Sequence, residues 1–97
     1  MDLSVPGGHV VVSGGSRGII LYRYTLDQFV ALDRHATHDI PEGCQVTVSD
    51  DGLFLEDPCS DSRWLIIDGS VIEGPATLPL HRYYTSWNPP VLRVYNN

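Results

Sequence analysis

The chain has 97 residues, of which 42% are hydrophobic and 19% charged, the composition of a globular protein with one core. Its net charge of −6, with six basic residues scattered singly, argues against nucleic acid and anionic membranes as partners. No apolar stretch approaches the roughly 20 residues that span a bilayer, so no membrane span is expected. We therefore expect residues 1–97 to form a single domain.

The pattern along the chain is that of an all-β protein. Short runs of branched and aromatic residues alternate with turns rich in Gly, Asp, Asn and Pro. In chain order the predicted strands cover residues 10–12, 18–24, 28–33, 46–49, 53–56, 64–67, 70–73, 82–85 and 91–95. The pair Asp68-Gly69 is typical of a two-residue type I′ turn, which predicts a tight hairpin at this point. No segment has a helical period of useful length.

Two further features have structural explanations. Residues 14–18, Gly-Gly-Ser-Arg-Gly, resemble a phosphate-binding loop, but they join two strands instead of opening a helix, so they predict a hairpin turn. Aromatic residues gather near the C-terminus at Tyr83, Tyr84, Trp87 and Tyr95. We expect them to close the core of a small β domain, and the alternative is a face that binds a protein or a sugar.

The order of strands and turns, together with four short stretches, makes the resemblance specific. These stretches are residues 29–34, residues 58–64, Gly74-Pro75-Ala76 and Pro79-Leu80. The chain resembles small bacterial Rieske-like domains of the ferredoxin type over nearly its whole length. The resemblance implies an all-β Rieske fold, in which antiparallel sheets stack and a smaller subdomain carries two loops at one tip.

The resemblance also implies what the two loops would hold. The family binds a 2Fe-2S cluster with the motifs C-x-H and C-x-x-H, so that two thiolates and two imidazoles are the ligands. In the second loop Pro58, Ser62 and the aromatic Trp64 are kept, while Asp61 replaces a glycine. At the four ligand positions the sequence has Ala36, His38, Asp57 and Ser60. Because both thiolates and one imidazole are missing, we expect no cluster and no other cofactor.

Three alternatives for the tip remain. The fold would bring His35, His38 and Asp39 near Asp57, Cys59 and Asp61, and imidazoles with carboxylates bind Zn²⁺, Fe²⁺ or Mn²⁺. A mononuclear metal site or small metalloenzyme would use His35, His38 and Asp57. A working 2Fe-2S electron carrier would need ligands other than those aligned above. A serine hydrolase is disfavoured, because Ser60 and Ser62 follow no nucleophile motif.

The two cysteines carry a separate implication of the resemblance. Some Rieske proteins have an extra cysteine in each loop, and these form a disulfide; Cys59, directly after Pro58, falls at one such position. Cys44 lies a few residues later than the usual partner, so both a Cys44–Cys59 bridge and two free thiols remain open. Closing a loop of about 15 residues would stabilise the fold by roughly 3 kcal/mol.

Function and location follow from these expectations. The start of the chain, Met1-Asp2-Leu3-Ser4, is neither basic nor followed by a hydrophobic signal segment, so we expect either a cytoplasmic protein or one from which a leader has been removed. A bridged Cys44–Cys59 pair would instead predict the periplasm or cell envelope, with a leader removed. We expect a non-redox binding or structural module and no enzyme. Its partner would be a protein or small ligand at the two loops.

Overall fold

The computed structural model describes residues 5–38 and 40–96, and this part of the chain forms nine strands and one short 3-10 helix, η1. The strands are β1 (His9–Val12), β2 (Ile19–Arg23), β3 (Phe29–Asp33), β4 (Thr47–Val48), β5 (Phe54–Glu56), β6 (Arg63–Leu65), β7 (Val71–Glu73), β8 (Arg82–Asn88) and β9 (Val91–Tyr95). The helix η1 covers Ile40–Glu42. Among the described residues no helix has the length and apolarity needed to cross a membrane.

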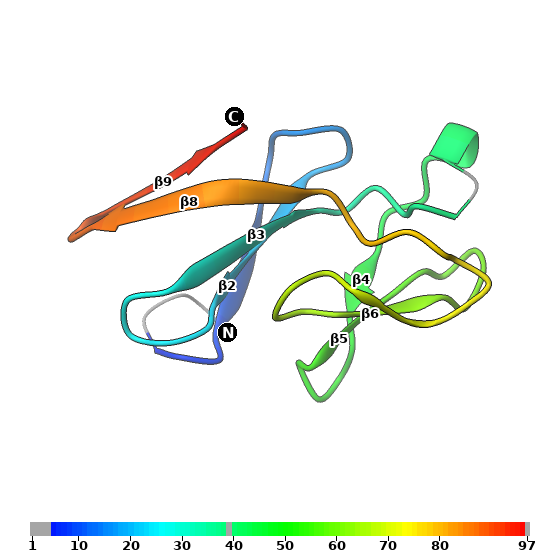
Figure 1. The fold of residues 1–97 in the computed structure, drawn as a ribbon, viewed down its shortest axis with the longest axis horizontal. Helices are drawn as coiled ribbons and strands as arrows, with labels where there is room; N and C mark the ends of the chain where they lie inside the picture. Colours follow the sequence, from blue (N-terminus) through cyan, green and yellow to red (C-terminus); the bar gives the residue numbers. More distant parts are fainter. Residues whose placement is uncertain (1–4, 39, 97) are drawn as a thin grey trace.

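The strands form two antiparallel sheets, as Figure 1 shows. The larger sheet has the order β1-β2-β3-β8-β9, and the smaller has the order β4-β5-β6-β7. The whole smaller sheet is therefore inserted in the chain between β3 and β8, two strands that pair with each other. This insertion creates the smaller subdomain, which lies on the same side of the molecule as η1 (Figure 1).

The main core lies between the two sheets. Successive side chains of a strand point to opposite faces, so Ile20 and Tyr22 of β2 point inward while Ile19 and Leu21 point to the other face. The inward cluster consists of Ile20, Tyr22, Val30, Leu32, Ala36, Val46, Leu55, Trp64, Ile66, Ala76 and Leu80. Both sheets contribute to it, so the smaller sheet packs on one face of the larger. On the other face, β2 and β3 pack against residues of β8 and β9.

The all-β prediction with stacked antiparallel sheets is confirmed, and β6 and β7 form the predicted hairpin, but the end of β6 and the type of turn were predicted wrongly. Strand β6 ends at Leu65 instead of continuing to residue 67. The chain turns after Leu65, where the Gly69 amide donates to the Leu65 carbonyl at 2.8 Å, although the Ile66 amide still bonds to the carbonyl of Leu53 at 3.1 Å in register with the β5–β6 pairing. A wide turn, and not a two-residue type I′ turn, therefore leads to β7.

Of the aromatic residues near the C-terminus, Tyr83 packs against a core cluster as expected, but Tyr84 and Tyr95 do not. Tyr84 and Tyr95 stack on each other with ring centroids 5.8 Å apart, yet they are 53% and 40% exposed. They do not close the core. Trp87 packs instead on Phe29 at 4.9 Å, and the Arg23 guanidinium lies over both rings. The antiparallel pairing of β8 with β9 accounts for this, because it places Tyr84 opposite Tyr95.

Candidate functional site

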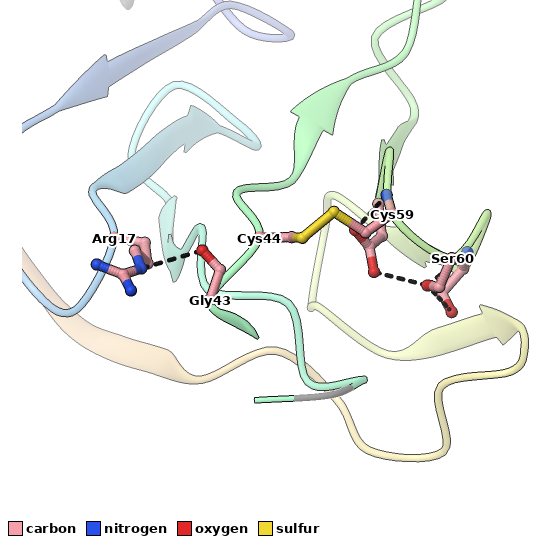
Figure 2. The surroundings of a disulfide bond; sticks show 7 residues. Arg17, Gly43, Cys44, Cys59 and Ser60 are labelled. Carbon is pink, nitrogen blue, oxygen red and sulfur yellow. Dashed lines mark hydrogen bonds between the residues drawn. A yellow bond between two sulfur atoms is a disulfide. The ribbon is translucent and has the colours of Figure 1, made fainter. Parts of the chain in front are cut away.

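Two loops at one end of the smaller sheet form the candidate site, and we refer to them together as the two-loop tip. The first loop, residues 34–46, joins β3 to β4, and the second loop, residues 57–62, joins β5 to β6. A disulfide between Cys44 and Cys59, whose Cα atoms are 6.5 Å apart, links the two loops (Figure 2). The sequence allowed either this bridge or two free thiols, and the structure has the bridge. Both cysteines of the chain take part in it.

The first loop follows Asp33, the last residue of β3, whose carboxylate side chain is only 3% exposed. It accepts hydrogen bonds from the backbone amides of Ser16 (2.7 Å), Arg17 (3.2 Å) and His35 (2.9 Å). It also accepts one from the Tyr83 hydroxyl at 2.6 Å. Four donors from three segments of the chain thus converge on one side chain, which fixes the direction in which the loop leaves β3.

The same contacts shift two pKa values. Burial alone would raise the pKa of Asp33, but the hydrogen bonds from Tyr83 and the three amides outweigh it and hold the pKa below its ordinary value of 3.8. Burial raises the pKa of the Tyr83 hydroxyl to about 12, and the hydrogen bond to the charged Asp33 acts in the same direction. At neutral pH the pair therefore consists of a carboxylate and a neutral phenol.

The turn between β1 and β2 supports the first loop from the side. The Arg17 Nε donates to the carbonyl of Gly43 at 3.0 Å, next to Cys44 (Figure 2). The side-chain Nε2 of Gln45 donates in turn to the backbone carbonyl of Arg17 at 2.7 Å. The Ser16 hydroxyl lies 2.7 Å from Nδ1 of His35. The segment that resembled a phosphate loop is thus a hairpin turn that positions the tip.

The second loop is organised by its own side chains. Asp57 is 2% exposed, and its Oδ1 accepts the Cys59 amide at 2.9 Å while its Oδ2 accepts the Ser60 hydroxyl at 2.6 Å. The Asp57 carbonyl accepts the amide of Asp61 at 2.9 Å. Asp61 has φ of 63°, the left-handed region that a glycine adopts more easily. Asp57 therefore closes the turn within the loop.

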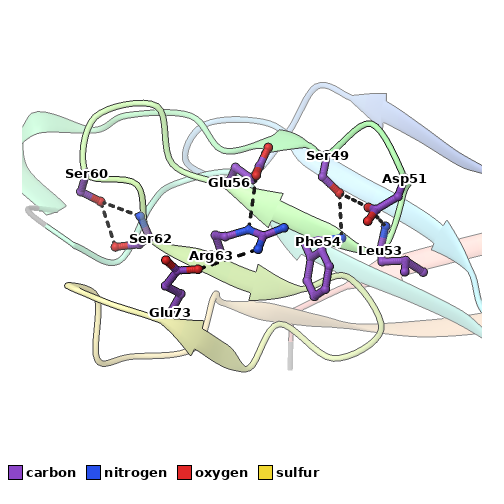
Figure 3. A network of polar contacts seen from close by, with 9 residues as sticks. All are labelled: Ser49, Asp51, Leu53, Phe54, Glu56, Ser60, Ser62, Arg63 and Glu73. Carbon is purple, nitrogen blue, oxygen red and sulfur yellow. Dashed lines mark hydrogen bonds and ion pairs between the residues drawn. The ribbon is translucent and has the colours of Figure 1, made fainter.

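A chain of polar contacts continues from the second loop into the core. The hydroxyls of Ser60 and Ser62 lie 2.9 Å apart (Figure 3), and the Ser62 hydroxyl accepts the Ala76 amide at 2.9 Å. Ser62 is fully buried. The carbonyl of Leu78 then accepts both the Thr37 hydroxyl at 2.6 Å and the Trp64 indole N–H at 3.0 Å. The segment after β7 therefore holds both loops.

Solved structures of other proteins have a fold similar to this one. The cyanobacterial plasma membrane Rieske protein PetC3 from Synechocystis PCC 6803 superposes with a TM-score of 0.75 at 23% identity, over 90% of this chain and 85% of that one. The chain has the Rieske fold. The ferredoxin of carbazole 1,9a-dioxygenase from Nocardioides aromaticivorans IC177 gives a TM-score of 0.67 at 17% identity, over 95% and 88%. No family model and no curated protein matches the chain.

The three predicted metal ligands, His35, His38 and Asp57, have different surroundings in this fold. The Asp57 carboxylate points into its own loop, His35 bonds to Ser16, and His38 is half-buried. Asp39 lies outside the described residues. Among the residues that are described, the group of His, Cys, Asp and Glu side chains with ligand atoms mutually within 4.8 Å is Glu42, Cys44 and Cys59. The sequence reasoning missed Glu42, although its position two residues before Cys44 was a usable signal.

The serines of the second loop also have defined partners. The contacts of Ser60 are the Asp57 carboxylate and the Ser62 hydroxyl, and Ser62 adds the Ala76 amide. These contacts are structural and do not resemble the pairing of a serine with an imidazole that activates a nucleophile. The structure therefore gives no support to a hydrolase at this loop of the Rieske fold.

Two open cavities flank the tip. One, of about 310 Å³, lies beside the first loop and is lined by Gly15, Ser16, Asp33, His35, Ala36, Thr37, His81 and Tyr83. The other, of about 580 Å³, lies beside the second loop and is lined by Thr47, Glu56, Asp57, Pro58, Asp61, Arg63 and Glu73. At the second cavity Arg63 lies 3.3 Å from Glu56, 3.8 Å from Glu73 and over the Phe54 ring (Figure 3). The exposed surface that lines the first cavity is mostly apolar, which suits a small ligand.

Proposed function

We propose that this chain is a Rieske-fold domain without a 2Fe-2S cluster, and that it serves as a non-redox binding module whose binding surface is the two-loop tip. One observation carries the proposal. The chain has two cysteines, and they are bonded to each other, so neither is a free thiolate. A Rieske cluster needs two thiolate ligands on one of its irons.

The donor set at the aligned ligand positions also does not fit the cluster. Ala36 offers no donor atom and is 1% exposed, as part of the core. Both Asp57 oxygens accept hydrogen bonds within the loop, and the Ser60 hydroxyl donates one of them. His38 is the single imidazole among the four positions. One imidazole cannot replace four metal–ligand bonds.

The loops have other means of holding their shape. The polar chain from Asp57 through Ser60 and Ser62 to Ala76 closes the second loop, and the disulfide joins the two loops. These contacts take over the fixing of the tip that metal bonds would otherwise supply. A rigid tip without redox chemistry is suited to recognition, because a preorganised surface loses little entropy on binding.

The cavity beside the first loop is the part of the tip that fits a small ligand. Its polar groups include the Ser16 hydroxyl and the imidazoles of His35 and His81, and the His81 ring meets the Tyr83 ring edge-on at 4.6 Å. A protein partner would instead contact the exposed residues of the second loop. The disulfide further leads us to infer an oxidising location, the periplasm or cell envelope, in preference to the cytoplasm.

Anaerobic reconstitution with iron and sulfide tests the proposal. We expect the wild-type protein to remain colourless and to retain neither element after desalting. The positive control is the triple variant Ala36→Cys, Asp57→Cys, Ser60→His, which restores the motifs around the native His38. A wild-type protein that takes up two irons and two sulfides per chain, with the visible absorption of a Rieske centre, would overturn the proposal.

A further inference from the structure

The disulfide has an unexpected neighbour. A carboxylate oxygen of Glu42 and the sulfur atoms of Cys44 and Cys59 all lie within 4.8 Å of one another. Glu42 is the last residue of η1, Cys44 follows two residues later, and Cys59 comes from the second loop. Glu42 and Cys59 are exposed and Cys44 is half-buried, so both a reductant and an ion from solvent can reach the group.

The backbone around both cysteines is held independently of the disulfide. The Cys44 carbonyl accepts the Ala36 amide at 2.9 Å, and the neighbouring Gly43 carbonyl accepts Arg17 Nε at 3.0 Å. The Cys59 amide donates to Asp57 Oδ1 at 2.9 Å. None of these contacts needs the S–S bond. Reduction therefore leaves two thiols facing each other across the loops, with the Glu42 carboxylate beside them.

We propose that reduction of Cys44–Cys59 converts this clamp into a mononuclear Zn²⁺ site whose ligands are the two thiolates and the Glu42 carboxylate. Thiolates and carboxylates are ordinary zinc ligands, and a water molecule completes the tetrahedral coordination. Zinc–sulfur bonds of about 2.3 Å at tetrahedral angles hold two sulfurs about 3.8 Å apart. Small side-chain rotations reach this separation, because the backbones of both cysteines already face each other.

The chemistry is a two-electron reduction followed by metal binding. A dithiol reductant gives two electrons and two protons to the Cys44–Cys59 disulfide and becomes a disulfide itself. Zn²⁺ then displaces the two thiol protons to solvent and binds the thiolates together with Glu42. The inference goes beyond the proposed function and does not depend on it. A domain clamped by a disulfide under oxidising conditions would thus be clamped by zinc under reducing ones.

The experiment titrates the full chain with Zn²⁺ alone, before and after reduction with a trialkylphosphine under argon. We expect one zinc per reduced chain, none per oxidised chain, and a higher melting temperature of the reduced protein when zinc is added. Co²⁺ used in place of Zn²⁺ should give thiolate-to-metal charge-transfer absorption. Glu42→Gln should weaken zinc binding by at least about tenfold. Loss of a residue that only orients a metal ligand already lowers metal affinity by about this factor, and Glu42 would be a ligand itself. The matched control Glu73→Gln, on β7, should bind like the wild type.

Three outcomes would overturn the inference. One is a reduced, folded protein that retains no zinc after desalting. Another is equal zinc affinity in the wild type, Glu42→Gln and Glu73→Gln, because an unspecific dithiol chelate would behave in this way. The third is a reduced chain whose far-ultraviolet circular dichroism shows unfolding, because the backbone contacts would then fail to hold the thiols in place. Uptake of iron and sulfide would contradict the proposed function instead, so the two failures are distinguishable.

Discussion

The Ser60 hydroxyl donates a hydrogen bond of 2.6 Å to the buried carboxylate of Asp57. This contact joins two of the four positions at which the Rieske resemblance expects cluster ligands. The other Asp57 oxygen accepts the Cys59 amide, so the carboxylate serves the loop in which it lies. These contacts therefore hold the second loop in shape without a metal–ligand bond.

Removing this carboxylate should loosen the second loop. We expect Asp57→Ala to lower the free energy of unfolding by about 2–3 kcal/mol, because the amide and hydroxyl that it serves become unsatisfied in a buried turn. Urea denaturation with the disulfide intact measures the change. Asp50→Ala is the matched control at an exposed turn, where we expect a change within about 0.5 kcal/mol. Equal effects of the two substitutions would refute a structural role for Asp57.

The disulfide should supply a large part of the stability. Replacing both Cys44 and Cys59 by serine removes a cross-link between residues 15 positions apart. We expect a loss of about 3 kcal/mol, because the unfolded chain regains the freedom that the loop closure denied it. Denaturation of the double variant measures this value, and wild-type protein under reducing conditions without metal should give a similar one. A loss below about 1 kcal/mol would show that the clamp is dispensable.

The turn before β2 should tolerate no side chain at Gly15. Gly15 has φ of 58°, and a Cβ there would collide with the Tyr83 hydroxyl and the Asp33 carboxylate. Gly52 has φ of 74° with open space around its Cβ position. A substitution at Gly52 therefore measures the cost of the backbone conformation alone, without steric overlap. We expect Gly52→Ala to cost about 1 kcal/mol and Gly15→Ala about 3 kcal/mol or more, since the second adds overlap to backbone strain. Thermal denaturation of both variants provides the comparison, and equal costs would contradict the close packing.

The Asp33–Tyr83 pair should make stability depend on pH in two separate windows. The folded pKa of Asp33 is lowered, so its contribution is present above the unfolded value of 3.8 and is lost as the pH falls below it. The folded pKa of Tyr83 is raised to about 12, so its contribution is present below the unfolded value of 10.0 and is lost as the pH rises towards 12.

Tyr83→Phe tests both windows at once. It should lower the free energy of unfolding at pH 7. The decrease in stability at acid pH should become smaller, and the decrease at alkaline pH that comes from Tyr83 should disappear. Urea midpoints measured across the pH range give the three readings. Tyr84→Phe, on the same strand but half exposed, is the matched control. If both variants follow the wild-type alkaline curve, the Asp33 contact does not hold the Tyr83 proton.

The sequence correctly predicted the strands that are defined by nearby residues in the chain. Strand β9 has the predicted bounds of residues 91–95, because the alternation of its side chains and the prolines before it define it without help from the rest of the chain. Strand β6 was predicted too long, because residues 64–67 are an unbroken run of β-prone side chains, whereas the chain turns after Leu65 and the Gly69 amide bonds to the Leu65 carbonyl. The side chains of this run do not show where the turn begins.

The sequence likewise predicted some features of the candidate site and not others. The order of the motifs located the two loops and identified Cys44 and Cys59 as candidate disulfide partners. The role of Asp33 was invisible, because its donors Ser16 and Tyr83 lie 17 and 50 residues away. The metal-site alternative made Asp57 a ligand, whereas in the structure both of its carboxylate oxygens accept hydrogen bonds within its own loop. Direction of a loop side chain is a tertiary property that residue type does not reveal.

The most direct test of the central claim is the iron and acid-labile sulfide content of the wild-type protein as isolated without air from cells that assemble iron–sulfur clusters. The account predicts colourless protein with neither element in stoichiometric amount, and Cys44 and Cys59 unreactive to thiol reagents until reduced. Brown protein with two irons and two sulfides per chain would contradict the account, because the chain would then be an electron carrier with ligands other than those aligned above.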